Sequence, residues 1–248
     1  MKKMYFAILF ALLSFASFAK KTDSRYFELR IYYCHEGRLD ALVQRFTNHT
    51  TKLFEKHGME NIGYWLPTDN KENALYYVLA FPSKEARDAS WKAFVEDPEW
   101  KEVAANSEKD GKIISKITSI FMNAAEISPI IKASIKSPER SFELRIVNCL
   151  PNRSQNFYDR FKNHTLKLLK KYHIEHIAYW TSIEANNAQP RYVYIVAHKS
   201  EEEGKKAWEA FRKDPKWIAA LNESEKDGKI TEKVESIYLK PLPFSKIK

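Results

Sequence analysis

The sequence contains little of what marks several common classes of protein. With six glycines in 248 residues, it has no glycine-rich phosphate-binding loop and no dinucleotide-binding fingerprint. Two cysteines are too few for a disulfide scaffold, and neither lies in a Cys-x-x-Cys motif. His173 and His176 have helical spacing but no third ligand, so we predict no metal site and no cofactor. A composition of 44% hydrophobic and 29% charged residues indicates a folded protein.

A long apolar run occurs at the N-terminus. Two lysines precede apolar residues over 4–13, and small residues at Ser17 and Ala19 suit cleavage. The run is shorter than the ~20 apolar residues of a spanning helix. We therefore predict a signal peptide over 1–19, removed on export to the periplasm or the medium, with no stable membrane insertion afterwards. An uncleaved anchor is the alternative.

The chain is basic, with 41 Lys and Arg against 32 Asp and Glu. Lys167, Lys170 and Lys171 cluster on one segment, but acidic residues are interleaved almost everywhere else. We therefore expect a solvated surface and no nucleic-acid partner.

After the N-terminal run, the sequence contains two copies of one repeat unit. The segment FELRI at 27–31 recurs 115 positions later at 142–146, and EKDGKI at 108–113 recurs at 225–230. Several matches at nearly one offset indicate an internal duplication. We predict a first domain over 24–128, a linker over 129–139 rich in proline and serine, and a second domain over 140–248.

Hydrophobic periodicity changes several times within each copy. Alternation over 27–31 predicts a strand with two different faces, and spacings of three and four from Leu39 to His57 predict a helix. Ser83 and Asp97–Pro98 are typical helix starts. Further strands are expected at 62–66, 75–81 and within 113–125. The order predicts an α+β, ferredoxin-like βαββαβ unit, with one short extra helix.

Each such sheet has helices on one face only, so its other face needs a cover. We expect the two antiparallel sheets to cover each other as a pseudo-dimer within one chain, while further oligomerisation stays open. The apolar side chains of 27–31 would then pack under the helices. A polar interior would be lined by Glu28, Arg30, Glu143 and Arg145.

Several of these residues resemble a known family. The features concerned are the ELR segment of the first strand, Gly37, a helix with an interior histidine, Gly63, Trp65, an aromatic third strand, Trp91, and Asp-Pro before Trp100. Together they resemble the pattern of the NIPSNAP family of the dimeric α/β-barrel superfamily. The resemblance covers both copies and implies that the tandem chain forms an intramolecular dimeric α/β barrel. Leu-Pro-Asn at 150–152, Ala178 and Tyr172 depart from the first copy. The resemblance implies no established reaction, although related barrels include monooxygenases, haem-degrading enzymes and binding proteins.

Three functions follow as hypotheses. The first is an exported protein that binds a small organic molecule between its sheets, the second a monooxygenase-like or isomerase-like enzyme, and the third a non-catalytic partner-binding module. Arginine suits carboxylate ligands, although a structural ion-pair network is the alternative for the four charged residues. Aromatic residues would form the pocket wall, or else belong to the core: Tyr64, Trp65, Tyr76, Tyr179, Trp180 and Tyr192.

Two histidines are the candidate catalytic residues. His49 and His164 occupy equivalent positions, three residues after a phenylalanine on the predicted helix. Either would act as a general base if it reached the cavity. The alternative is a core histidine that hydrogen-bonds a backbone carbonyl.

The two cysteines also occupy equivalent positions, just after the first strand of each copy. Cys34 and Cys149 would form a disulfide only if their α-carbons approached within ~7 Å. Whether they are free stays open at this point.

Overall fold

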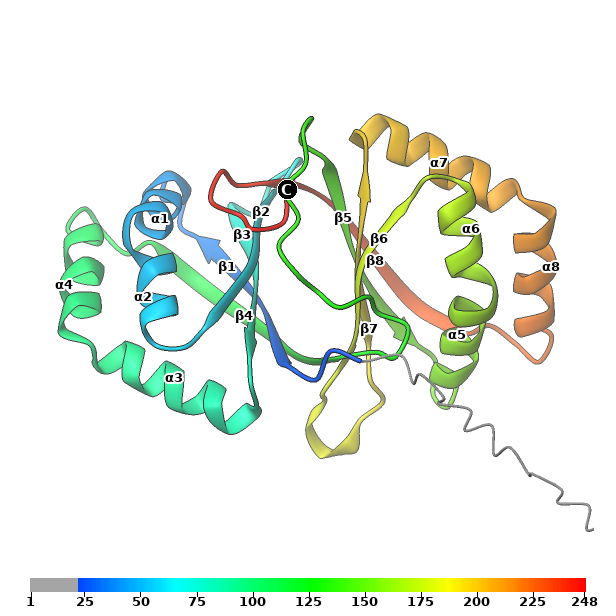
Figure 1. Cartoon of the computed structure of the whole chain (residues 1–248), viewed down its shortest axis with the longest axis horizontal. Helices are drawn as coiled ribbons and strands as arrows, with labels where there is room; N and C mark the ends of the chain where they lie inside the picture. The colour runs from blue at the N-terminus through cyan, green and yellow to red at the C-terminus, as the bar shows by residue number, and fades with distance from the viewer. Residues whose placement is uncertain (1–21) are drawn as a thin grey trace, which may run out of the picture.

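The computed structural model describes residues 22–248, and the predicted signal peptide at 1–19 lies outside this part of the chain. Each repeat follows the predicted order of elements, with an extra helix before its last strand (Figure 1). The first repeat consists of β1 (Tyr26–Cys34), α1 (Leu39–Arg45), the π-helix η1 (Phe46–Thr50), α2 (Thr51–Lys56), β2 (Glu60–Pro67), β3 (Ala74–Phe81), α3 (Lys84–Glu96), α4 (Pro98–Ser107) and β4 (Ile114–Ala124). The second repeat consists of β5 (Ser141–Cys149), α5 (Ser154–Arg160), the π-helix η2 (Phe161–Thr165), α6 (Leu166–Lys171), β6 (Glu175–Ser182), the short 3₁₀ helix η3 (Ala185–Asn187), β7 (Tyr192–His198), α7 (Glu201–Lys213), α8 (Pro215–Ser224) and β8 (Thr231–Pro241).

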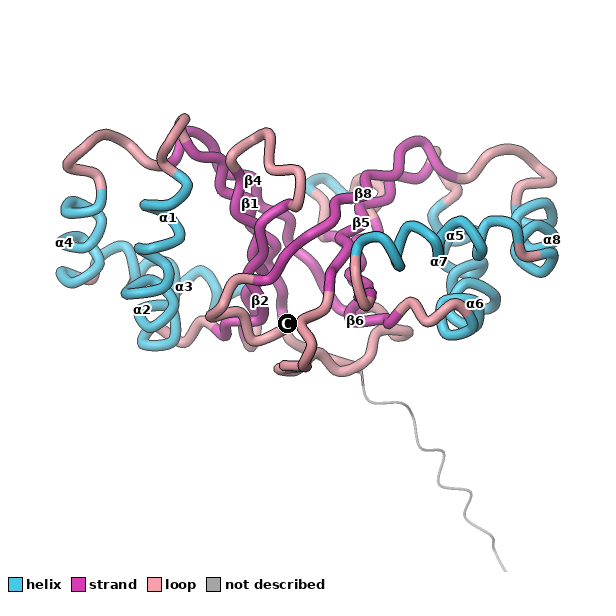
Figure 2. Tube along the Cα trace, turned by 90° about the horizontal axis from the view of Figure 1, so that it is seen from above, coloured by secondary structure: helices cyan, strands magenta, loops and turns pink. Residues whose placement is uncertain are grey.

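The strands form a closed antiparallel barrel in the order β1-β3-β2-β8-β5-β7-β6-β4. Each repeat contributes four neighbouring strands, and short pairings of β2 with β8 and of β4 with β6 join the two repeats. The helices of the two repeats lie outside the barrel on opposite sides (Figure 2). The predicted α+β fold, two ferredoxin-like units forming one barrel within the chain, is therefore confirmed.

The interior of the barrel is apolar and filled by side chains. Inward-facing residues of both repeats form one buried cluster, which includes the alternate residues of β1 from Phe27 to Ile31. The Phe27 ring lies 5.7 Å from that of Trp180, and the Trp65 ring lies 5.9 Å from that of Phe142, so rings of the two repeats pack together. An eight-stranded barrel is just wide enough for such side chains. The prediction of a polar interior is therefore wrong.

The charged residues of β1 and β5 face the helices instead. Period-two alternation shows that two faces differ, but it does not show which face meets the helices. Both faces are covered here, because no residue of β1 or β5 is exposed. A buried carboxylate needs partners, and arginine and tryptophan side chains can reach it from a helix but not from an apolar interior.

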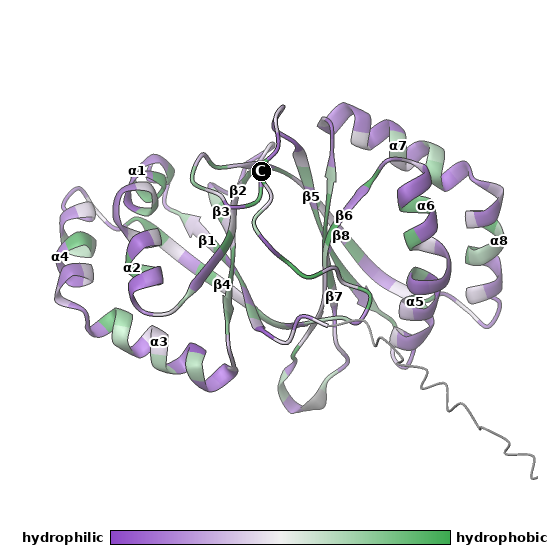
Figure 3. Cartoon of the chain, viewed as in Figure 1, coloured by the Kyte–Doolittle hydropathy of each residue, from purple (hydrophilic) through white to green (hydrophobic). Residues whose placement is uncertain are grey.

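The helices begin where the sequence predicts and pack by their apolar faces. The Ser83 hydroxyl accepts a hydrogen bond from the Ala86 amide at 3.1 Å, and the Asp97 carboxylate accepts one from the Glu99 amide at 2.8 Å. Ser200 and Asp214 cap α7 and α8 in the same way. Hydrophobic and hydrophilic residues alternate around these helices, as expected when one face lies on a sheet (Figure 3).

The segment after each repeat's last strand closes over the barrel. After β4, the Ser128 hydroxyl accepts a hydrogen bond from the Tyr179 amide at 3.1 Å, and Ile131 enters the interior cluster. After β8, Ser245 and Ile247 take the equivalent places. The predicted linker is thus packed structure over at least part of its length.

Candidate functional site

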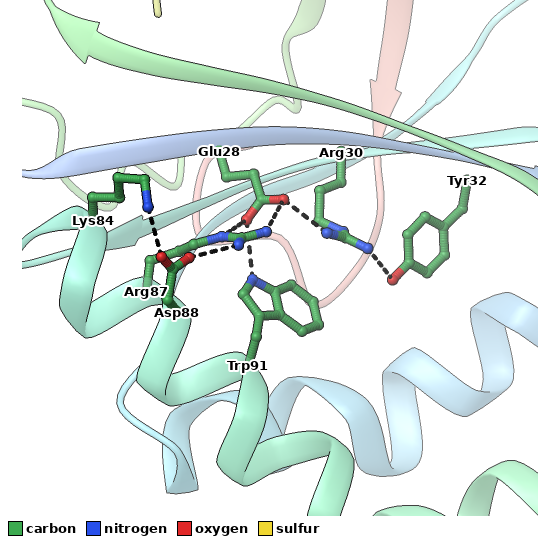
Figure 4. A network of polar contacts seen from close by, with 7 residues as sticks. All are labelled: Glu28, Arg30, Tyr32, Lys84, Arg87, Asp88 and Trp91. Carbon is green, nitrogen blue, oxygen red and sulfur yellow. Dashed lines mark hydrogen bonds and ion pairs between the residues drawn. The ribbon is translucent and has the colours of Figure 1, made fainter. Parts of the chain in front are cut away.

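A buried carboxylate, Glu28 of β1, organises the helix-facing side of the first repeat (Figure 4). Oε1 accepts hydrogen bonds from Arg30 Nη1 at 2.7 Å and Arg87 Nη2 at 3.0 Å. Oε2 accepts from Arg87 Nε at 2.9 Å and from Trp91 Nε1 at 3.0 Å. Burial alone would raise the pKa of Glu28, but Arg87 and Arg30 hold that pKa below its ordinary value. All four acceptor sites are used, so this carboxylate has none left for a ligand.

Glu143 of β5 occupies the equivalent place with different partners. Its Oε1 accepts hydrogen bonds from Arg145 Nε at 2.6 Å and from the Ser236 hydroxyl at 2.5 Å. Its Oε2 lies 3.1 Å from His198 Nε2 and accepts from Trp208 Nε1 at 2.5 Å. Burial raises the pKa of this carboxyl, but hydrogen bonds from His198, Ser236 and Arg145 and the charge of Arg145 outweigh it and lower the pKa to about 2.

Two linked replacements explain the change of partners. At the offset of 117, Gly204 stands where the first repeat has Arg87, and His198 stands where it has Phe81. A β-carbon at Gly204 would lie only 2.7 Å from His198 Cγ, so the imidazole occupies the space above the glycine. The second repeat thus has an imidazole from β7 where the first repeat has a guanidinium from α3.

In the first repeat, Tyr32 fills the space beside this network. Its ring packs 6.0 Å from that of Phe46 and 5.2 Å from that of Tyr77, and it is 7% exposed. Its hydroxyl accepts a hydrogen bond from Arg30 Nη2 at 3.2 Å (Figure 4). The guanidinium of Arg30 is therefore bound on both sides, by Glu28 and by Tyr32.

In the second repeat, Val147 stands at the position of Tyr32, and a pocket of about 320 Å³ lies between the sheet and the helices. β5 and β8 form its floor, and η2, α5, α7 and α8 form its walls. Its apolar lining includes Val147, Phe157, Phe161, Phe211, Trp217 and Leu221. A volume of this size is at the lower end of the range for small-molecule sites.

Arginines give the pocket a positive character. The Arg145 guanidinium carbon lies 4.0 Å from the centre of the Trp208 ring, and that of Arg160 lies 5.3 Å from the Trp217 ring. Arg160 also pairs with Glu225 at 3.1 Å. Arg212, at the rim, has no ion-pair partner within residues 22–248. Stacked guanidinium groups of this kind suit planar anions.

A π-helix borders the pocket. Phe161 and Thr165, the first and last residues of η2, both line it. The Thr165 hydroxyl donates to the Arg160 carbonyl at 3.4 Å, and Thr50 of η1 donates to Arg45 at 3.2 Å in the same way. Single π-helical turns inside α-helices are frequent at functional sites.

The structure divides the predicted ligand-binding residues between two faces. Trp65, Tyr76 and Trp180 lie in the barrel interior. The others lie on the helix-facing side, in the first repeat (Glu28, Arg30 and Tyr64) or in the second (Glu143, Arg145, Tyr179 and Tyr192). They do not form a single site, and of this set only Arg145 lines the pocket described above.

His49 and His164 are both exposed, so neither hypothesis about these histidines holds. They lie in η1 and η2, but on the outer side of the helices, away from the barrel interior and from the apolar clusters. His49 borders a polar surface groove of about 570 Å³ between α1 and α4. Neither histidine lines the second-repeat pocket, so neither is placed to act as a base there.

Sequence reasoning missed most of the pocket. It named none of five lining residues as ligand-binding, namely Val147, Arg160, Trp208, Arg212 and Trp217. Comparison of the two copies does show that Val147 stands where the first copy has Tyr32. Its meaning required knowing that this face lies under the helices.

Cys34 and Cys149 are buried and unbonded. Burial raises the pKa of both thiols to about 11.

Across residues 22–248, no group of three metal-ligating side chains comes together. No helix in the same region has the length and apolar character needed to cross a membrane.

Comparisons with known proteins agree with this architecture. The NIPSNAP family model matches residues 27–129 and 142–246. Protein NipSnap homolog 3A of Homo sapiens is 24% identical over 230 residues, covering 85% of this chain and 82% of that protein, and the Pongo abelii protein of the same name matches equally. A monooxygenase-like protein from Fusobacterium nucleatum superposes with a TM-score of 0.60 at 10% identity, covering 88% of this chain and 93% of its own. An anthrone oxidase-like protein gives 0.59 at 12% identity, covering 90% and 94%. At such identities the structural likeness shows the fold alone.

Proposed function

Because this chain belongs to the NIPSNAP family along both of its repeats, we propose that it acts as an exported protein that binds a small organic molecule. The binding site lies between the helices and the sheet of the second repeat, not between the two sheets as the sequence led us to expect. The barrel interior is lined by a buried cluster of mostly apolar side chains, which suits a polar ligand poorly.

The pocket of about 320 Å³ is the observation that supports this proposal. It combines an apolar floor at Val147 with a guanidinium, that of Arg145, which is held in place by a buried carboxylate. Small-molecule sites typically combine an apolar lining with a few fixed polar groups. A fixed guanidinium also loses little conformational entropy when it binds a ligand.

Export rests on the N-terminal sequence. A basic start, an apolar run and small residues before Lys20 are typical of a signal peptide. Mass spectrometry of the protein isolated from its own host would give the N-terminus of the mature chain. A protein that begins at Lys20 in the exported fraction supports the proposal, and a full-length intracellular chain contradicts it.

Native mass spectrometry of the same material tests ligand binding. We expect a small-molecule adduct on the wild-type protein, and its loss in Val234→Trp, where an indole would narrow the pocket. Ile117→Trp is the matched control, because Ile117 is the equivalent residue of the first repeat and both positions are 45% exposed. No adduct, or an adduct that survives Val234→Trp, would overturn the proposed site.

A further inference from the structure

We infer that the second-repeat pocket takes a small aromatic ring bearing an anionic oxygen, a carboxylate or a phenolate, and that Tyr32 is the built-in counterpart of this ligand in the first repeat. This inference rests on the proposed function and specifies its ligand. It depends on the comparison of two nearly equivalent environments within one chain.

The first repeat shows how this environment holds an aromatic ring. Tyr32 makes edge-on contacts with Phe46 and Tyr77, with interplanar angles of 76° and 82°. The Arg30 guanidinium lies 5.2 Å from the Tyr32 ring centre and donates to its hydroxyl at 3.2 Å. Figure 4 shows the Arg30 guanidinium between the Glu28 carboxylate and the Tyr32 hydroxyl. A phenol is thus bound by an aromatic wall and a fixed guanidinium.

The second repeat keeps the binding groups but lacks the phenol. Phe161 and Tyr194 stand where Phe46 and Tyr77 stand, and both line the pocket. Arg145 stands where Arg30 stands and is anchored to Glu143 at 2.6 Å. Its Nη1 lies 3.5 Å from the Tyr194 hydroxyl, the limit of a hydrogen bond, and its Nη2 has no partner within residues 22–248.

Neighbouring side chains compensate only partly for the missing ring. Phe157 and Tyr192 are larger than their first-repeat equivalents, which are leucines, and their rings stack 5.1 Å apart. The Tyr192 hydroxyl donates to the Ser154 carbonyl at 2.8 Å and so does not reach Arg145. The pocket of about 320 Å³ remains despite these larger rings, with Val147 and Phe157 both in its lining.

Charge favours an anion over a neutral ligand. Arg145, Arg160 and Arg212 line the pocket. Glu143 pairs with Arg145 and Glu225 with Arg160, whereas Glu209, the carboxylate near Arg212, is itself paired with Lys213. Three guanidinium groups against two carboxylates leave one positive charge in excess. The first repeat has Val95 in place of Arg212, and its own additional guanidinium, that of Arg87, is bound to Glu28. A carboxylate or phenolate would hydrogen-bond Arg145 Nη2 and offset the excess charge.

Isothermal titration calorimetry with 4-hydroxybenzoate tests the inference, and cyclohexanecarboxylate and benzyl alcohol separate the contributions of ring and charge. We expect about one site per chain for 4-hydroxybenzoate, and binding at least about tenfold weaker for the two analogues. Val147→Tyr should abolish binding, because the new side chain reproduces Tyr32. Arg212→Gln should weaken binding about threefold, the scale of an exposed charge pair.

The reciprocal variant provides the decisive measurement. Tyr32→Val removes the internal phenol, so the stoichiometry for 4-hydroxybenzoate should rise from about one to about two sites. Thermal melts would verify that each variant is folded, and filling the pocket with Val147→Tyr should not lower the melting temperature. Equal binding of cyclohexanecarboxylate, unchanged binding by Val147→Tyr, or an unchanged stoichiometry in folded Tyr32→Val would overturn the inference.

The outcome also separates this inference from the proposed function. If the host-derived adduct is lost in Val234→Trp but 4-hydroxybenzoate does not bind at millimolar concentration, the site stands and the ligand class is wrong. If native mass spectrometry detects no adduct and 4-hydroxybenzoate does not bind, both proposals are wrong.

Discussion

Gly204 lies against the ring of His198 so closely that a β-carbon there would come within 2.7 Å of Cγ and 2.8 Å of Cδ2. The glycine is in the interior of α7, where alanine would normally be the better helix former by about 1 kcal/mol. His198 is nearly fully buried and bound to Glu143, so its ring cannot move away without breaking the carboxylate network. The glycine is therefore explained by the close approach of His198 to the helix backbone.

We expect Gly204→Ala to destabilise the protein by about 1–3 kcal/mol, the usual cost of overpacking a filled site. The sign is the opposite of the usual effect of replacing glycine by alanine in a helix. Urea denaturation followed by circular dichroism would measure the change in the free energy of unfolding. Glu209→Ala, at an exposed position of the same helix, should stay within about 0.5 kcal/mol. A stabilised Gly204→Ala would contradict the packing described here.

The cysteines should be unreactive in the folded protein. Cys34 and Cys149 are 7% and 6% exposed, and burial raises their pKa values to about 11, so little thiolate forms at pH 8. We expect no labelling by Ellman's reagent over the time in which a free thiol reacts completely. In denaturant, both thiols should react. Rapid labelling of the native protein would mean that the ends of β1 and β5 open readily.

The order and type of the elements could be predicted because local signals agree with the fold. Ser83 and Asp97 cap helices by hydrogen bonds that depend only on neighbouring residues. The direction in which a strand faces carries no such local signal. Phe27 and Glu28 alternate in the same way whichever side the helices take, and here the apolar set faced the other sheet. Our assignment of the charged face to the interior therefore failed, although the barrel itself was correct.

Differences between the repeats were visible in the sequence, but their effects were not. Tyr172 replaces His57, yet each binds the aspartate that caps the last helix of its repeat, at 2.7 Å and 2.6 Å respectively. Val147 replaces Tyr32, and there the difference coincides with a pocket. Whether a replacement preserves a contact or leaves a space depends on the helices packed above it. A single sequence does not contain that information at the level of side-chain volumes.

The shared interior should make the two repeats depend on each other. Phe142 of the second repeat packs on Trp65 of the first and is fully buried. We expect Phe142→Ala to lower the free energy of unfolding by about 3–5 kcal/mol, because it leaves a cavity in a filled core. Unfolding monitored at both tryptophan fluorescence and far-UV circular dichroism should remain one coincident transition. Ile183→Ala, at a position 40% exposed, is the control and should change little. Two separate transitions would contradict a common core.

Glu143 should make stability depend on acid pH. Its folded-state pKa of about 2 lies below the ordinary 4.5, so the unfolded chain binds the proton more readily. The stabilisation is fully present above pH 4.5 and is lost as the pH falls toward 2, and it amounts to about 3 kcal/mol for a difference of this size. Glu143→Gln removes the titrating group and leaves Arg145 without its buried partner, so it should cost about 3–5 kcal/mol at neutral pH. Its unfolding free energy should then fall less steeply between pH 4.5 and 2 than that of the wild type. Glu232→Gln, at an exposed position of β8, should retain the wild-type slope. Parallel pH profiles for Glu143→Gln and the wild type would show that the Glu143 network contributes no pH-dependent stability.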